Sequence, residues 1–177
     1  MAIVDSQSIL SDRQVVTDVT YSQHGFDWGT NADYGTGKPI YLAVTIHGAF
    51  AKNLRIQLVG SDEADITNPI VLGDSGLYKK AELTAGKTIY VQLVQTNKKY
   101  RYMCARYIPS AEGTAEDPNA VPTGTSACDC APLGRPPKVG EKQPELANGL
   151  SACLVLVAPT EGVYYKYANQ EKLTAGV

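Results

Sequence analysis

The feature that most constrains the fold of this chain is an alternation of apolar and other side chains with a period of two residues. It is clearest in residues 39–47, where the even positions are Ile40, Leu42, Val44 and Ile46. Because successive side chains of a β-strand point to opposite faces, this period predicts a strand with one buried face. The alternation recurs at residues 54–58, 89–93 and 100–104, and the apolar run 150–158 predicts a more deeply buried strand.

Turn-forming residues separate these runs. Glycine-rich turns are predicted at residues 35–37 and 73–76, and a Glu-Gly turn at 161–162 precedes a possible last strand over 163–167. No helical period of any length is present, and residues 60–69 have room for one helical turn at most. Seven to nine short strands without long helices predict an all-β fold, an antiparallel jelly-roll or β-sandwich barrel.

Two segments differ from the strand-rich body. Residues 1–20 have apolar side chains without a clean period, which favours an N-terminal arm that docks elsewhere. Residues 109–149 hold seven of the ten prolines and no aromatic residue, so they are interpreted as an irregular insertion between two strands. Whether the insertion crosses a neighbouring subunit or is partly disordered stays open. The expected organisation is an arm over 1–20 and one jelly-roll domain over 21–177 that contains the insertion.

Charge and hydropathy limit the classes of partner that this chain is expected to bind. Sixteen basic against eighteen acidic residues give a formal net charge of −2, which argues against electrostatic binding to nucleic acid or to an anionic membrane. The N-terminal sequence lacks a basic region followed by an apolar run, and no stretch has the roughly 18 apolar residues that span a bilayer. We therefore expect synthesis in a cytoplasm and no membrane partner.

No catalytic motif is recognised. The run Gly35–Lys38 fails as a phosphate loop because Ala32 stands where the first glycine belongs and Pro39 follows the lysine. His47 falls on the polar side of its predicted strand, which favours a solvated or interface histidine. Ser, His and Asp are all present, but no serine has a nucleophile-elbow sequence around it. The expectation is that the protein is not an enzyme and has no catalytic residues or small-molecule ligand.

Four cysteines raise the question of a metal. Cys128 and Cys130 are the weak candidates for ligands, with Cys104 or Cys153 able to complete a site. Zinc pairs more often have two or more intervening residues and a second pair, so no metal and no cofactor are expected. Free thiols suit a cytoplasmic chain, and the two cysteines within strand patterns are predicted to be small core residues.

Two basic spots are candidates for nucleic-acid contacts. One is Lys79–Lys80, and the other combines Lys98–Lys99 with Arg101 and Arg106 beside several tyrosines. Strict alternation would place Tyr100 and Tyr102 on the face opposite Arg101, so a stacking platform is not expected there.

The order of the segments resembles the capsid cement proteins of the Bordetella-phage type. The similar segments are Gly35-Thr-Gly-Lys-Pro-Ile-Tyr41, Gln57-Leu-Val-Gly-Ser-Asp62, Lys99-Tyr-Arg-Tyr-Met103 and the tail Leu173-Thr-Ala-Gly-Val177. They match that family's G-x-G-x-P-L-Y, Q-L-x-x-S-D, K-R-Y-L-R and T-A-G-x-V patterns, and the resemblance covers roughly residues 20–108 and 150–177. Residues 109–149 depart from it, because the usual version has a short connection there.

The resemblance implies a jelly-roll homotrimer that binds the major capsid protein on the outside of an icosahedral head. Such a cement, or decoration, protein of a bacteriophage stabilises capsomer contacts as a structural component of the virion. Two alternatives remain, a carbohydrate- or receptor-binding β-sandwich of a virion and a jelly-roll enzyme. Asp27 and Trp28 are weak hints of a sugar site.

Overall fold

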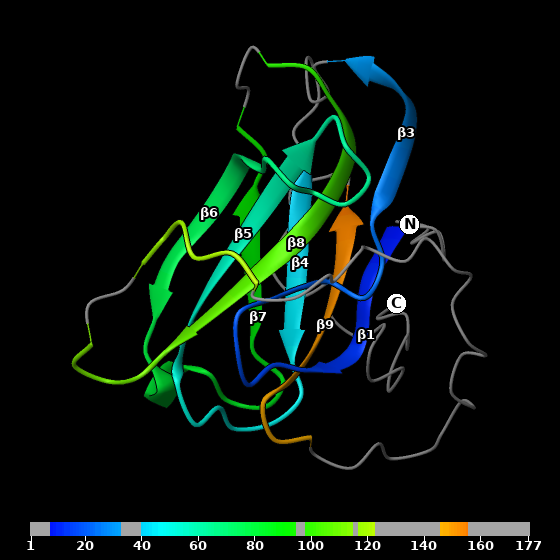
Figure 1. The fold of residues 1–177 in the computed structure, drawn as a ribbon. Helices are drawn as coiled ribbons and strands as arrows, with labels where there is room; N and C mark the ends of the chain where they lie inside the picture. The colour runs from blue at the N-terminus through cyan, green and yellow to red at the C-terminus, as the bar shows by residue number, and fades with distance from the viewer. Residues whose placement is uncertain (1–7, 33–39, 95–97, 115–116, 123–145, 156–177) are drawn as a thin grey trace, which may run out of the picture.

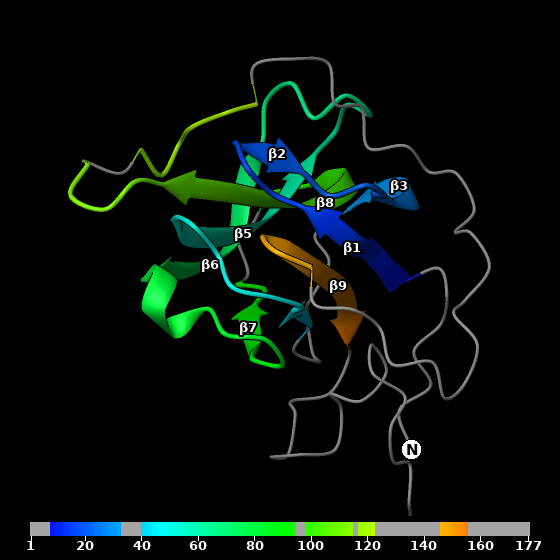
Figure 2. The ribbon, with the colours of Figure 1, turned by 90° about the horizontal axis from the view of Figure 1, so that it is seen from below.

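The computed structural model describes residues 8–32, 40–94, 98–114, 117–122 and 146–155. Within these ranges the chain forms two antiparallel β-sheets that pack face to face, as two views at right angles show (Figures 1 and 2). The strands are β1 (Ile9–Val15), β2 (Thr20–Tyr21), β3 (Phe26–Ala32), β4 (Tyr41–Ile46), β5 (Asn53–Ser61), β6 (Ile70–Tyr78), β7 (Thr88–Gln92), β8 (Tyr100–Ser110) and β9 (Gly149–Val155). A short 3₁₀ helix covers Lys80–Glu82.

Sheet I has the strand order β1-β9-β4-β7, and sheet II has the order β2-β8-β5-β6, with β3 also paired to β8. Most neighbours in the sheets are far apart in sequence, as when β1 pairs with β9, whereas β5 and β6 are consecutive strands. The predicted all-β, antiparallel jelly-roll or β-sandwich fold is confirmed.

The main core lies between the sheets. On β4 the predicted apolar face is confirmed, because Leu42, Val44 and Ile46 are fully buried. From sheet II, Leu54, Ile56 and Leu58 of β5 face them. Burial of a side chain of this size stabilises a fold by about 1.5–3 kcal/mol, so this alternation accounts for why the two sheets stay together.

Backbone hydrogen bonds also join the two sheets at both sides of the sandwich. Beyond β7, the Val94 N–H donates to the Leu72 carbonyl of β6 over 2.6 Å. At the other side, the His24 N–H donates to the Leu10 carbonyl of β1 over 2.8 Å. The sandwich is thus a flattened barrel, in which strands that end a sheet have partners in the other sheet.

The expected N-terminal arm is wrong for residues 9–16. Residues 9–15 form β1, and Leu10 and Val16 belong to the main core. The reason for the missed strand is local. Arg13 has a left-handed φ of 51°, and the pairing with β9 shifts register between Ser11 and Gln14. A β-bulge of this kind interrupts the period of two that identifies a strand.

The turn predicted at residues 73–76 is also wrong, because these residues lie inside β6. Gly73 is required by close approach, since a Cβ there would contact the Gln92 carbonyl oxygen and come within 3.0 Å of Val91 Cγ1. Gly76 has a left-handed φ of 69° and accommodates a bulge in the strand. The helical turn allowed at residues 60–69 does not form.

The insertion expected at 109–149 has narrower limits. β8 extends to Ser110, β9 begins at Gly149, and residues 111–114 and 117–122 are described as turns and irregular chain. Residues 123–145, with Cys128 and Cys130, lie outside the described residues, as do the predicted turn at 35–37, the possible strand at 163–167 and the tail. The irregular character of the central insertion therefore stays a prediction.

Replacing Gly73 by alanine is expected to destabilise the protein more than the same change at Gly76. The first substitution forces β6 away from Val91 and Gln92 and costs about 1–3 kcal/mol, as overpacking does. The second places its Cβ in open space and costs about 1 kcal/mol of left-handed strain. Urea unfolding followed by the fluorescence of the single tryptophan, Trp28, measures both. Equal midpoints for the Gly73 variant and the wild type would show that β6 and β7 are not in close contact.

Candidate binding surface

The outer face of sheet II carries a row of polar side chains. Neighbouring strands place Asp74 of β6 opposite Gln57 of β5, and Gln57 opposite Arg106 of β8. Tyr21 of β2 continues the row on the far side of Arg106. The four residues lie on the sheet face opposite the main core, a face that β-sandwiches usually leave to solvent.

Side-chain hydrogen bonds run along this row. Arg106 Nε donates to Gln57 Oε1 over 3.0 Å, and Gln57 Nε2 donates to Asp74 Oδ2 over 2.7 Å. Arg55 Nε donates to Asp74 over 2.8 Å from the other side. Burial by itself raises the pKa of Asp74, but hydrogen bonds from Arg55, Gln57 and the Gly76 N–H outweigh it and hold that pKa below its ordinary value. The carboxylate is therefore ionised at neutral pH.

Segment 117–122 covers the middle of the row. The carbonyl oxygen of Pro118 accepts hydrogen bonds from Gln57 Nε2 at 3.1 Å and from Arg106 Nη2 at 3.3 Å. The segment crosses the outer side of sheet II in both views (Figures 1 and 2). Arg106 is only 2% exposed as a result. Burying a guanidinium costs free energy unless its N–H groups donate hydrogen bonds. The Gln57 amide oxygen and the Pro118 carbonyl oxygen accept such bonds from Arg106 and so make its burial possible.

A small apolar cluster lies beside the polar row. It consists of Tyr21, Val59, Ile66 and Cys104, with Tyr102 packed against it. Ile66 comes from the loop between β5 and β6 and has a left-handed φ of 55°, which lets its side chain reach back onto the sheet. Much of the outer face of sheet II is therefore a second, smaller core rather than an open surface.

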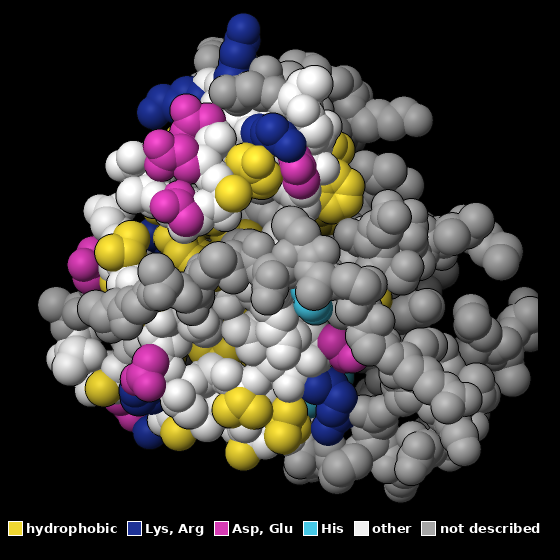
Figure 3. Space-filling model, turned by 45° about the vertical axis from the view of Figure 1, so that its right-hand side comes forward, with side chains coloured by type: hydrophobic (Ala, Val, Ile, Leu, Met, Phe, Trp, Pro, Cys, Tyr) yellow, Lys and Arg dark blue, Asp and Glu magenta, His cyan; other side chains and the backbone are white. Residues whose placement is uncertain are grey.

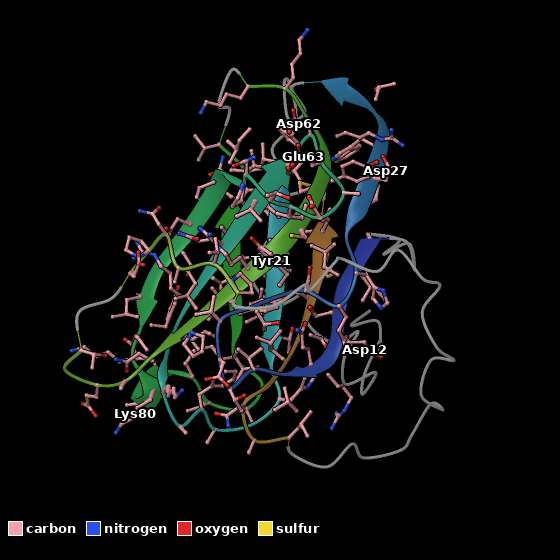
Figure 4. The ribbon with its side chains drawn as sticks, in the orientation of Figure 1. Asp12, Tyr21, Asp27, Asp62, Glu63 and Lys80 are labelled. Carbon is pink, nitrogen blue, oxygen red and sulfur yellow. The ribbon has the colours of Figure 1, made fainter. Side chains whose placement is uncertain are left out.

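Figure 4 places Asp62 and Glu63 of this loop at one end of the sandwich and Lys80 at the other. Both acidic side chains are exposed, and so is Asp65. The Glu63 N–H donates to Ser61 Oγ and the Thr67 N–H donates to Asp65 Oδ1, which fits a solvated turn.

The expected separation of Arg101 from both tyrosines is wrong. The guanidinium of Arg101 lies 5.0 Å from the ring centre of Tyr102, whereas Tyr100 is buried in the main core. A register shift between β3 and β8 breaks the alternation there. Tyr100 and Tyr102 thus pack in different clusters, so the three side chains do not form one stacking platform.

The contacts of Asp27 and Trp28 argue against a sugar site at β3. Asp27 binds Arg101 through both carboxylate oxygens, at 2.8 and 2.9 Å, and also accepts the Gly29 N–H. The Arg101 hydrogen bonds lower the pKa of Asp27. Trp28 packs on Phe26, with ring centres 4.4 Å apart, and both lie against the main core. An acid already paired and a tryptophan turned to the core are poorly placed to hold a sugar ring.

Ser151, His47 and Asp12 come together, but not in the order of a catalytic triad. His47 Nε2 lies 2.8 Å from Ser151 Oγ, whereas the Asp12 carboxylate lies 3.5 Å from the same hydroxyl. A triad needs its carboxylate on the imidazole. The Ser151 oxygen also accepts the Arg13 N–H, which ties it to the β1 bulge. His47 itself is 7% exposed, so it is not the solvated histidine that the alternation allowed, and the interface alternative stays a prediction.

Of the two cysteines predicted to be core residues, Cys104 is confirmed, whereas Cys153 is only partly buried. Cys104 is fully buried, and burial raises the pKa of Cys153 to about 11, which keeps that thiol protonated. Among the described residues, no three His, Cys, Asp or Glu side chains are grouped as metal ligands. Cys128 and Cys130 lie outside those residues, so the expectation about them stays untested.

The two basic spots also separate. Lys79, Lys80, Lys98 and Lys99 are exposed, and Lys80 pairs with Glu112. Arg106 is buried and belongs to the polar row instead. Sequence reasoning missed this row because alternating polar residues on a strand usually mark a solvated face. The one available signal was that Arg106 lies between apolar residues, Cys104 and Ile108, at the same period of two.

A comparison with known protein families shows which family this chain resembles. The family described as Bbp16 matches residues 10–118, more than half of the chain. The match begins in β1, runs through β8 and ends at Pro118, the residue whose carbonyl binds Gln57 and Arg106. No curated protein matches the chain. No helix among the described residues is long and apolar enough to cross a membrane.

Replacing Arg106 by methionine is expected to release segment 117–122 from sheet II. The change keeps an apolar stem but removes the donors for Gln57 and Pro118, and hydrogen bonds to a buried charged group stabilise by about 1.5–3 kcal/mol. Urea unfolding and hydrogen exchange of residues 117–122 measure the loss. Arg101→Met on the same strand is the matched control and should have the smaller effect, because Arg101 pairs with Asp27 at the surface. Unchanged exchange in the Arg106 variant would contradict the role given to Pro118.

Proposed function

This chain belongs to the Bbp16 family, whose name points to a Bordetella phage, and we propose that it is a structural protein of the virion that cements the capsid. In this role it binds the major capsid protein on the outer surface of an icosahedral head. The observation that carries the proposal is the family match over residues 10–118, and the segment similarities found in the sequence support it.

The physical properties of the sandwich support this role. A cement protein holds neighbouring capsomers together, which requires a stiff body and wide contact surfaces rather than a reactive site. Here the two sheets are bonded to each other at both sides, and one sheet has packed side chains on both of its faces. Dense packing of this kind resists deformation.

The proposal includes no catalytic activity. Ser151 lies beside His47, as a nucleophile lies beside its base, but its oxygen accepts the Arg13 N–H and His47 is nearly inaccessible to solvent. Charge supports the absence of a nucleic-acid partner. The formal net charge is −2, and acidic and basic side chains are interspersed on the described part of the face in Figure 3.

We expect the protein to be a homotrimer, as the resemblance to cement proteins implies. Size-exclusion chromatography with light scattering should give a mass near three times 19.0 kDa, at a concentration close to that used for capsid binding. A dilution series is the control, because the mass of a weak trimer falls as the concentration falls. A mass of one chain at every concentration, on free protein and on protein eluted from heads, would contradict the trimer.

The insertion is expected to supply part of the capsid contact. Deleting residues 124–144 and bridging the gap with Gly-Ser keeps both Pro118 and Leu146, whose backbone groups bond to the sandwich. The deletion should leave the thermal midpoint nearly unchanged but weaken binding to heads about tenfold, which corresponds to about 1.4 kcal/mol. The measurement is occupancy of heads that lack the protein, across a concentration series.

A matched variant replaces residues 124–144 with a Gly-Ser segment of equal length. It separates the loss of side-chain contacts from the effect of chain length, and should bind as weakly as the deletion. Full occupancy by both variants would show that the insertion does not contact the capsid. Failure of the intact protein to bind any phage head would contradict the cement function itself.

A further inference from the structure

His47 lies where three parts of the sandwich meet. It follows β4 directly, its N–H donates to the Gly149 carbonyl at the start of β9, and its own carbonyl accepts the Leu146 N–H. Its imidazole Nε2 is 2.8 Å from Ser151 Oγ of β9. With 7% of the residue exposed, the ring has almost no contact with solvent.

Through Ser151, the imidazole is connected to the bulge of β1. Arg13 lies in the interval where the register between β1 and β9 shifts, and its N–H donates to Ser151 Oγ over 2.9 Å. A side-chain hydroxyl thus takes the place of a strand carbonyl at this point. β1 ends sheet I, so it can leave without breaking the pairing of β9 with β4 or of β4 with β7.

The single proton of the Ser151 hydroxyl limits what this arrangement can hold. While His47 is neutral, Nε2 can accept that proton and the hydroxyl oxygen remains free to accept the Arg13 N–H. A protonated imidazole carries a hydrogen on both ring nitrogens, so Nε2 must then donate to Ser151. The Ser151 hydroxyl then has Asp12 Oδ1 as its acceptor, at the long hydrogen-bond distance of 3.5 Å.

We propose that His47 is a pH-sensitive latch for β1, and that its protonation in mild acid releases this strand from β9 while the rest of the sandwich stays folded. The latch operates in the free protein and does not depend on capsid attachment. This role is conformational, and it belongs to a histidine that has no catalytic role in the Ser-His-Asp grouping.

The charges around the imidazole give the direction of the effect. Burial lowers the pKa of His47, Arg13 of β1 lowers it further, and Asp12 of β1 opposes them. β9 contributes the uncharged Ser151, and the chain before β9 contributes backbone groups. The two charged neighbours named here both belong to β1, and the effect of Arg13 is the larger, so release of β1 removes a net opposition to protonation of the ring. Protonation therefore favours the released state.

The sign with pH follows from this lowered pKa. Above the ordinary histidine value of 6.5, the imidazole is neutral in both states and β1 docking does not depend on it. As the pH falls below 6.5, the released state binds the proton first, so docking weakens by up to about tenfold per pH unit. The weakening stops once the pH is below the lowered value, where both states are protonated.

Hydrogen exchange of the peptide covering β1, at several pH values from 7.5 to 5.0 and corrected for the intrinsic rate, tests the latch. The opening constant of β1 should rise several-fold toward pH 5, while β5 and β8 stay protected. His47→Gln, whose amide can still bond to Ser151, should remove the pH dependence. His24→Gln is the matched control, because the chain has only these two histidines, and it should behave as the wild type.

Proton NMR of the wild type provides a readout that does not rely on any variant folding. Two histidine ring signals are expected, and that of His47 should titrate below pH 6.5, where the rise in the opening constant of β1 levels off. An exchange profile of β1 that does not change with pH would overturn the latch, as would a pH dependence that persists in His47→Gln or disappears in His24→Gln.

Discussion

The pairing of β5 with β8 is the constraint on which both cores depend. All nine residues of β5 pair with residues of β8, from Asn53 with Ser110 to Ser61 with Tyr102. On one face this register brings Ile56 beside Tyr107 in the main core, and on the other it brings Gln57 beside Arg106. A slip of one residue would exchange the two faces of a strand. Because both faces are buried, the slip would place polar side chains in the main core.

Because segment 117–122 covers the outer face of sheet II, the folded domain extends beyond the end of β8. Arg106 is buried next to the neutral acceptors Gln57 and Pro118, and Asp74 balances its charge only through the Gln57 amide. Such a network is stable only when its donors and acceptors are all used. Residues 117–122 are therefore part of the folded unit, although their proline-rich sequence resembles the insertion that follows.

The sequence was sufficient to predict the strands that have one apolar face. β4 and β7 alternate without interruption, and Cys104 was correctly predicted as a core residue. Strand β1 was not predicted, because the bulge at Arg13 interrupts the period of two in its sequence. The burial of Gln57 and Arg106 was not predicted for a different reason. The atom that covers them, the Pro118 carbonyl oxygen, is 61 residues from Gln57, and no local pattern shows that such a distant segment covers a strand.

The family match ends at Pro118, but the sandwich cannot end there. Sheet I has the order β1-β9-β4-β7, so without β9 the strand β1 has no neighbour in it. The chain must therefore return, and it does so at a second fixed point, where the Leu146 N–H bonds to the His47 carbonyl and a Cβ on Gly48 would collide with Leu146. Both ends of the insertion are held by the sandwich, one on each sheet. The free energy of closing a flexible loop changes slowly with its length, so the length between these two points can vary widely while β9 keeps its place.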